Sequence, residues 1–536
     1  MQTVKTTHTP RDFNAELESG STEQLMDHLA LDRIDMLLVV VYLACVTGLG
    51  LWLSRGVSSS SDLFLAGRSL PWWAVGTSLV VSDIGAKDMV GLADDGYRYG
   101  LVMTNFDFIG CVFPVLIAAF LVLPYFWLAG VYTIPEYLGR RYNATVRILF
   151  AVAWGVFMIG TLAVIFVSAA TMFQNLLGWK FWHSVAGTAI LVGAYTAFGG
   201  LRAVVFTDFV SCIVLIIGAA LICVFGLQQT GGWSGLQQQI AALPHTEHHF
   251  DLLLPADSPT PYPWPAVLLG LGFVLGPAYW MGNQAIVQRS FGTRSAAEAR
   301  ASYVLCAAIK LVFPLLLVVP GLIGLALYHN ELGDASGPDW EAGSVLPRVV
   351  GLLPNGVLGI VLGAFLAGVM SNLDSYVNSA STLWVNDLYR PLIRPEATDR
   401  ECLTVGRWLI VVFMAAGMAG SYLVVHGFDS VYEAFQTFMS LIQGSLFALL
   451  LMGMLSRWAT AAGGVAGILV GVGTAVVLQF GQSWVLWEMS ISFLWVAWWS
   501  FVAALTAIAT VSLVTKPHST DHLTGLVYWL PRTEES

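Results

Sequence analysis

The chain has 536 residues, of which 57% are hydrophobic and only 11% are charged. An average soluble protein carries about 25% charged residues, so this composition excludes a soluble enzyme and a nucleic-acid-binding domain. Together with a mean hydropathy of +0.72, it predicts an all-α polytopic membrane protein. The six cysteines contain no closely spaced pair, so the sequence shows no disulfide framework and no zinc motif.

Thirteen apolar runs are long enough to cross a bilayer, since each crossing takes about 20 residues. They lie at 36–54, 73–92, 101–128, 146–177, 183–199, 205–226, 262–285, 301–328, 354–386, 405–426, 433–455, 459–480 and 484–514. Residues 1–34 form a polar tail without the features of a signal peptide, and residues 516–536 form a second short tail. The region between the tails, 35–515, is predicted to be the membrane domain.

Charge placement predicts the orientation of the runs. Most of the 24 Lys and Arg residues fall in one set of alternate loops. Examples are Arg140, Arg141, Arg147, Arg289, Arg294 and Arg300. Basic loops stay on the cytoplasmic side, so the amino terminus is expected outside and the carboxy terminus inside. The longest outer loop, 228–261, has no Lys or Arg but contains three histidines, at 245, 248 and 249, which suit either a metal site or, more commonly, a solvated loop.

Charged side chains cluster inside the second run. Asp83, Lys87 and Asp88 stand next to Gly85, although each charge costs at least ~2.5 kcal/mol to insert. If the run is a continuous helix, Asp83 and Lys87 can pair on one face as a structural ion pair. The third charge and the glycines favour instead a broken helix, whose free backbone groups form ion and solute sites in transporters.

Further polar groups lie in other runs. They are Asp107 in the third, Asp208 in the sixth, Lys310 in the eighth, and Ser371, Asn372, Asp374, Ser375 and Asn378 in the ninth. Four of the last group share one helix face, and such a stripe can simply hold helices together. Its aspartate favours a cation site instead. The seventh run is interrupted by Pro277, which removes a helix hydrogen bond shortly before Tyr279.

Several stretches between about Asp62 and Leu455 resemble the sodium:solute symporter family, particularly its bacterial sodium/galactose and sodium/sialic-acid branches. These stretches are Gly67–Gly76, Gly130–Tyr137, Gly199–Asp208, Gln288–Arg289, Asn378–Leu383 and Asp387–Tyr389. The resemblance implies a LeuT-type fold of two inverted five-helix repeats, here about 73–226 and 262–455, with one helix before them and two after.

The resemblance also implies sodium, the coupling ion, at two positions. Site one maps to Val81, Ile84, Gly368, Ser371 and Asn372, where the asparagine replaces a usual serine. Site two, present in some members, maps to Asp208, Ser371, Asp374 and Ser375, where Asp374 replaces a serine. Both departures keep an oxygen that can bind sodium.

The family's solute pocket maps to positions that are mostly charged here. They are Asp83, Lys87, Asp88, Asp107, Tyr279 and Lys310, together with Gly110, Gly276 and Met439. Only Tyr279 and Lys310 keep the residue types of the galactose transporter, so the solute is expected to be polar but not specifically galactose. The outer hydrophobic gate maps to Leu92, Phe106 and Phe435.

These patterns predict a secondary active transporter of the bacterial inner membrane, with no catalytic site. It is expected to import a small polar solute, such as a sugar, sugar acid or polyol, with sodium and without an obligate protein partner. Two alternatives stay open: a sodium-independent or proton-coupled carrier of the same fold, and a transporter-like membrane sensor. The short carboxy-terminal tail leaves little room for a signalling domain.

Overall fold

The structure is a computed structural model that describes residues 32–55, 57, 59–333, 340, 343–427, 431–481, 491–528 and 530. Its described elements are helical, with two isolated β-bridges between loops. Most of the predicted amino-terminal tail and the end of the carboxy-terminal tail lie outside the described residues.

Eleven described helices are long and apolar enough to cross a membrane. They are Arg33–Ser54, Ala86–Trp127, Ala144–Gln174, Gly200–Thr230, Trp264–Gly282, Ala296–Leu332, Val357–Ile393, Asp399–Gly427, Ala434–Leu455, Ala461–Phe480 and Phe493–Val514. The protein is therefore an all-helical, multi-pass membrane protein, as predicted. Two predicted runs are missing from this set, because 73–92 is split and 183–199 contains only the shorter apolar helix Phe181–Gly193.

The split run consists of α5 (Trp72–Asp83) and α6 (Ala86–Tyr99). Ile84 and Gly85 between them are extended, with φ/ψ of −87°/116° and −133°/−167°. Glycine is required for space, since a Cβ on Gly85 would lie 2.6 Å from the Asn372 side chain. The chain is thus broken by a close approach from a distant helix.

The first half of the chain contains further elements before and after this break. They are α3 (Arg33–Ser54), α4 (Ser60–Leu65), η1 (Ala66–Arg68), η2 (Gly100–Thr104), α7 (Asn105–Asp107), η3 (Phe108–Val112), α8 (Phe113–Ile117), η4 (Ala118–Val122), α9 (Leu123–Ala129), α10 (Ile134–Arg141), α11 (Ala144–Leu177), α12 (Phe181–Thr230) and α13 (Gly232–Ala241). Gly200 interrupts α12 with φ 57° and ψ −168°, so α12 is two helical segments.

The second half contains a similar break. Its elements are α14 (Trp264–Ala266), η5 (Val267–Leu275), α15 (Gly276–Gly282), α16 (Gln284–Phe291), α17 (Ala296–Lys310), α18 (Phe313–Leu332), α19 (Val345–Val350), α20 (Val357–Trp384), η6 (Val385–Ile393), α21 (Asp399–Gly427), α22 (Val431–Leu455), α23 (Ala461–Phe480), α24 (Phe493–Val514) and α25 (Thr520–Leu523). Asn283, between α15 and α16, is extended with φ −71° and ψ 115°, close to the values of Ile84.

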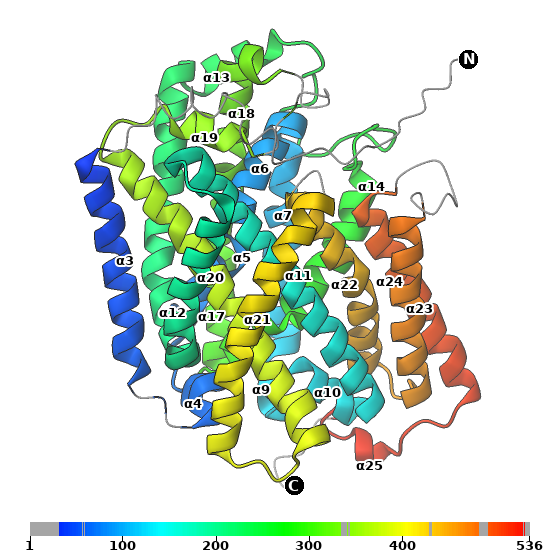
Figure 1. Ribbon diagram of the computed structural model, residues 1–536. Helices are drawn as coiled ribbons and strands as arrows, with labels where there is room; N and C mark the ends of the chain where they lie inside the picture. Colours follow the sequence, from blue (N-terminus) through cyan, green and yellow to red (C-terminus); the bar gives the residue numbers. More distant parts are fainter. Residues whose placement is uncertain are drawn as a thin grey trace.

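α20 forms the centre of the bundle, where it packs against α3, α5, α11 and α12. In its most apolar window 83% of the residues are buried, against 17% for α3. α3 lies at one edge of the bundle and α23 and α24 at the other (Figure 1). Asp35 ties α3 to the start of α20, because its Oδ1 accepts hydrogen bonds from the amides of Gly356 and Gly359 at 2.8 and 2.6 Å. The polar residues of α20 therefore face the protein interior.

Candidate functional site

The break after α5 leaves backbone carbonyls without helical donors in the middle of the bundle. Asn372 Nδ2 on α20 donates to the carbonyl of Val81 at 2.9 Å, and Lys87 Nζ on α6 donates to that of Asp83 at 3.2 Å. Side chains from two helices thus converge on the break. This convergence creates a polar centre within an otherwise apolar core.

A cavity of about 70 Å³ lies beside the break. Small-molecule sites usually measure roughly 300–1,000 Å³, so a sugar-sized solute would require this cavity to widen. Its lining includes all six predicted solute-binding residues, Asp83, Lys87, Asp88, Asp107, Tyr279 and Lys310, and also Gly110, Gly276 and Met439. The structure brings these nine positions together, and their contact with a solute stays a prediction.

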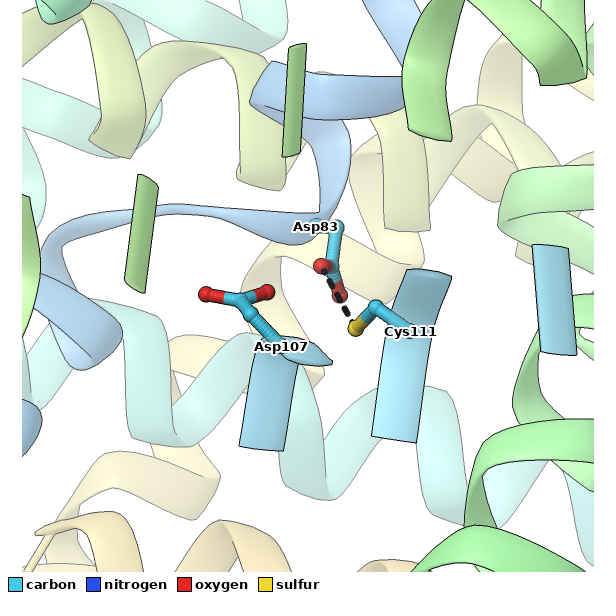
Figure 2. Close-up of side chains that lie close together, drawn as sticks. All are labelled: Asp83, Asp107 and Cys111. Carbon is cyan, nitrogen blue, oxygen red and sulfur yellow. Dashed lines mark hydrogen bonds between the residues drawn. The ribbon is translucent and has the colours of Figure 1, made fainter. Parts of the chain in front are cut away.

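Lys310 neutralises one side of the cavity. Its Nζ donates to Asp107 Oδ1 at 2.5 Å and also to Asp83, and Cys111 Sγ lies 3.8 Å away. Figure 2 shows these two carboxylates and the thiol turned towards one another. Their ligand atoms lie within 4.8 Å and are the one group of this kind found among the described residues. Because the ammonium already bonds to all three, the group is a lysine-binding cluster.

Lys87 pairs with its neighbour on the other side of the cavity. Its Nζ lies 2.6 Å from Asp88 Oδ2 and 4.2 Å from the centre of the Phe435 ring. The predicted side-chain pair between Asp83 and Lys87 does not form, because the helix is broken between them and Asp83 bonds to Lys310. Asp88 Oδ2 also accepts from the amide of Gly85 at 2.8 Å, so one carboxylate both caps α6 and pairs with Lys87. Three carboxylates and two ammonium groups leave this cavity with one net negative charge.

The three predicted gate residues also line the cavity. Leu92 and Phe435 are each only 4% exposed. Phe106 is partly exposed and packs edge-on against Tyr262, with ring centroids 5.8 Å apart. These residues form an apolar wall beside the charged one, and their gating role stays a prediction.

The predicted sodium site one lies where α20 crosses the break. Gly368 touches it closely, since a Cβ there would lie 3.1 Å from the Cα of Gly85. The hydroxyl of Ser371 and the amide oxygen of Asn372 are buried without a hydrogen-bond partner among the described residues. Buried oxygens that accept no hydrogen bond, beside the backbone carbonyls of the break, are the donor set that a hard cation takes, so the residues present fit sodium.

The predicted sodium site two contains a protein cation. Arg289 on α16 is fully buried, its Nε donates to Ser78 Oγ at 2.8 Å, and its terminal nitrogen lies 3.5 Å from Asp208 Oδ2. The same guanidinium donates to Ser375 Oγ. Asp208 further accepts from Ser78 Oγ at 2.5 Å. Positive charge is therefore already present between two of the four predicted ligands.

Arg141 and Arg289 were both expected in cytoplasmic loops, but each is 0% exposed. Arg141 donates to the backbone carbonyls of Gly453, Ala459 and Ser456. Gln288, next to Arg289, is also fully buried, and its side-chain amide donates to the carbonyl of Phe64 at 2.7 Å. Trp280, Cys111 and Gln436 also line the solute cavity without having been predicted there. Trp280 alone had a signal, its position next to Tyr279.

The histidines of the long outer loop do not gather around a metal in the described residues. His248 pairs with Asp251 at 2.7 Å, whereas His249 is buried and bonds to the carbonyl of Tyr97 at 3.1 Å. The carbonyl of His249 accepts from the amide of Leu101 at 2.8 Å. Burial lowers the pKa of His249 below its usual value. The loop is thus docked on the junction of α6 and η2, a few residues before Phe106.

Comparison with known proteins identifies relatives along most of the chain. A model of the sodium:solute symporter family matches residues 63–471. A sodium/glucose cotransporter of Vibrio parahaemolyticus is 30% identical over 92% of both chains. Sodium/glucose cotransporter 2 of Rattus norvegicus is 35% identical over 75% of this chain and 64% of its own length. The solved structure of a Na⁺-coupled sialic acid symporter superposes with a TM-score of 0.80 at 19% identity, covering 91% of this chain and 99% of that one.

The structural match establishes the fold, a LeuT-like helical bundle, and confirms that part of the prediction. The family match covers well over half of the chain, and it makes the protein a transporter and not an enzyme. The chain therefore belongs to the sodium:solute symporter family, whose members couple the movement of a solute to that of sodium.

Proposed function

We propose that this protein imports a small neutral polyhydroxylated solute, such as a sugar or polyol, down a sodium gradient by alternating access. One observation carries the proposal: the cavity lined by Asp83, Lys87 and Lys310 adjoins unsatisfied oxygens on α20 across the break after α5. Solute and ion would then share the same broken helix. A shared element is the physical requirement for coupling their binding.

The chemistry of the cavity supports a neutral solute over an acid. Both ammonium groups are already paired with carboxylates, and the cavity carries one net negative charge. A carboxylate-bearing solute would add repulsion, whereas hydroxyl groups can both donate to Asp88 and accept from Lys87. The relatives named sodium/glucose cotransporters agree with a neutral sugar.

Sodium in this proposal occupies site one, held by the carbonyls of Val81, Ile84 and Gly368 and by the side chains of Ser371 and Asn372. The Asn372 amide would turn its oxygen towards the ion, which requires exchanging the present Nδ2 bond to Val81. At a membrane potential of about 100 mV, one sodium gains roughly 2.3 kcal/mol. This energy alone supports a solute gradient of about fiftyfold.

We propose one sodium per solute while Arg289 stays in its described position. The second site, formed by Asp208, Ser371, Asp374 and Ser375, would bind sodium only after the guanidinium moved, because like charges repel at this distance. The Arg289 guanidinium then supplies the positive charge that a second sodium would supply at a site of this kind. The alternative of proton coupling predicts uptake that follows a proton gradient and ignores sodium.

The proposed topology has thirteen crossings, with the amino terminus outside and the carboxy terminus inside. It takes α6 from the long helix Ala86–Trp127 and joins it to α5 as one crossing, leaves the rest of that helix as the next crossing, and adds the first part of α12. The breaks at Ile84 and Asn283 fall in the first helix of each proposed inverted repeat, 73–226 and 262–455, with the same extended backbone conformation. The proposed location is a bacterial inner membrane, in keeping with the resemblance to bacterial symporters.

Uptake into proteoliposomes tests the function. Purified full-length protein would be supplied with glucose, galactose, a sugar acid or a polyol under sodium, potassium or proton gradients. The proposal expects sodium-dependent accumulation of a neutral sugar. Accumulation driven by protons alone would support the alternative, and binding without transport would support a sensor.

A further inference from the structure

A groove of about 490 Å³ opens on the outer surface of the bundle between α5 and α17. Its lining consists of Trp72, Ala297, Arg300, Ala301, Val304, Leu305 and Ala308. None of these residues lines the solute cavity. Trp72 and Val304 are 41% and 39% exposed, and α17 belongs to a candidate membrane span, so the groove faces lipid.

The level of the groove in the membrane can be worked out from α17 and from α5 independently. Arg300 precedes Lys310 on α17 by ten residues, which corresponds to roughly 15 Å of helix. Trp72 precedes Asp83 on α5 by eleven residues, roughly 16 Å. Lys310 bonds to Asp83 at the central break. Because half of the hydrocarbon core is about 15 Å thick, Arg300 and Trp72 lie at the level of the lipid headgroups.

The chemistry of the groove changes along its length. The Arg300 guanidinium is exposed and lies 5.9 Å from the centre of the Phe120 ring, and in the described part of the chain no carboxylate lies within ion-pair distance of it. An unpaired guanidinium suits a phosphate, which it can bind through two parallel hydrogen bonds. Deeper in the membrane, Ala301, Val304, Leu305 and Ala308 form one apolar helix face with a shallow surface.

We propose that this groove binds an anionic phospholipid, whose phosphate contacts Arg300 and one of whose acyl chains lies along α17. The polar end and the apolar trough are adjacent and in the order that a lipid requires. By the proposed topology the lipid belongs to the cytoplasmic leaflet. The groove lies against α5, so a bound lipid packs on the helix that ends at the candidate sodium site.

Native mass spectrometry of the full-length protein in detergent tests this proposal, with phosphatidylglycerol or phosphatidylcholine added as probes. The wild type is expected to retain one phosphatidylglycerol more strongly than phosphatidylcholine. Arg300→Gln should lower that affinity about fivefold, since one basic residue near an anionic headgroup contributes about that factor. Arg294→Gln removes an exposed charge from a residue that does not line the groove and whose Nε donates to the carbonyl of Ser69, and it is the control.

A second pair of variants tests the apolar part without changing charge. Ala301→Trp fills the trough and should also release the lipid, whereas Leu315→Trp on the exposed surface of α18 should not. Equal retention of both lipids by the wild type would overturn the proposal. Equal losses of phosphatidylglycerol affinity in Arg300→Gln and Arg294→Gln would also overturn it, as would full retention of the lipid by Ala301→Trp. These results would mean that charge attracts the lipid to the surface without the lipid binding in the groove.

Discussion

Replacing Ser371 with alanine is the sharpest test of sodium site one. The hydroxyl of Ser371 is buried beside the Asp208 carboxylate and has no hydrogen bond of good geometry among the described residues, so its removal should cost the fold little. Folding stability is therefore expected to stay within about 0.5 kcal/mol of the wild type. A hydrogen bond or ligand contact to a charged group contributes about 1.5–3 kcal/mol, which corresponds to a roughly 10- to 150-fold weaker affinity.

The assay is solute uptake into proteoliposomes as a function of sodium concentration. Ser371→Ala should need about tenfold more sodium for half-maximal uptake. This is the lower end of the estimated range, because water can replace part of the lost contact. Ser381→Ala on the same helix is the control, because it should change the stability of the protein and leave its sodium dependence unchanged. Its hydroxyl donates to the carbonyl of Gly406 at 2.8 Å, so this variant should lose about 1 kcal/mol of stability and keep normal sodium dependence.

The reasoning fails if Ser371→Ala shows the same half-saturating sodium concentration as the wild type. It also fails if the variant is strongly destabilised, because the hydroxyl would then hold the protein together. Sodium-dependent protection against heating in detergent gives an independent reading of the same affinity.

Four further variants address the remaining groups. Lys310→Met leaves the Asp83 and Asp107 carboxylates without their buried partner, which costs about 3–5 kcal/mol in soluble proteins. The melting temperature of this variant in detergent should therefore fall, and adding Asp107→Asn should restore part of the loss. Lys87→Met should change which sugars are taken up in a competition panel while the protein stays folded, and an unchanged preference would make Lys87 purely structural. Asp374→Asn should leave the sodium-to-solute ratio at one, and a fall from two to one in flux measurements would establish the second sodium site. Docking of the loop 228–261 should weaken as the pH falls below about 6.5. Burial lowers the pKa of His249 in the docked loop, so the released loop binds the proton more tightly and protonation favours release. Hydrogen exchange around residue 249 at pH 5 and 7.5 measures this change, and His249→Gln should abolish the difference.

The sequence predicted the membrane spans well because each depends on local hydropathy. It predicted the cavity residues through family positions, since Asp83 and Lys310 are 227 residues apart and no local pattern joins them. The rule that residues four apart can pair fails at Asp83 and Lys87, because that rule assumes a continuous helix. The break between them depends on the approach of Asn372 from α20, a contact that spacing along the chain does not encode.

Arg289 illustrates the opposite failure. Charge counting treats every arginine near the end of an apolar run as a loop residue, yet Arg289 lies on the buried helix α16 and contacts Asp208, Ser78 and Ser375. A buried arginine costs free energy unless it is fully bonded, and its three partners come from three other helices. Only the tertiary structure reveals that these partners are present.

The contact between Gly85 and Gly368 has a kinetic consequence. Most helix pairs interlock through side chains, so sliding one past the other requires coordinated rotamer changes and transient gaps. At this crossing the two glycine backbones meet directly, and the Asn372 side chain of α20 packs beside them on Gly85. α20 can therefore rotate or shift against the broken helix at that point once the Asn372 side chain moves. The barrier to such a movement is set mainly by the charged and hydrogen-bonded groups around the crossing, which are the groups that a cation or a solute can exchange.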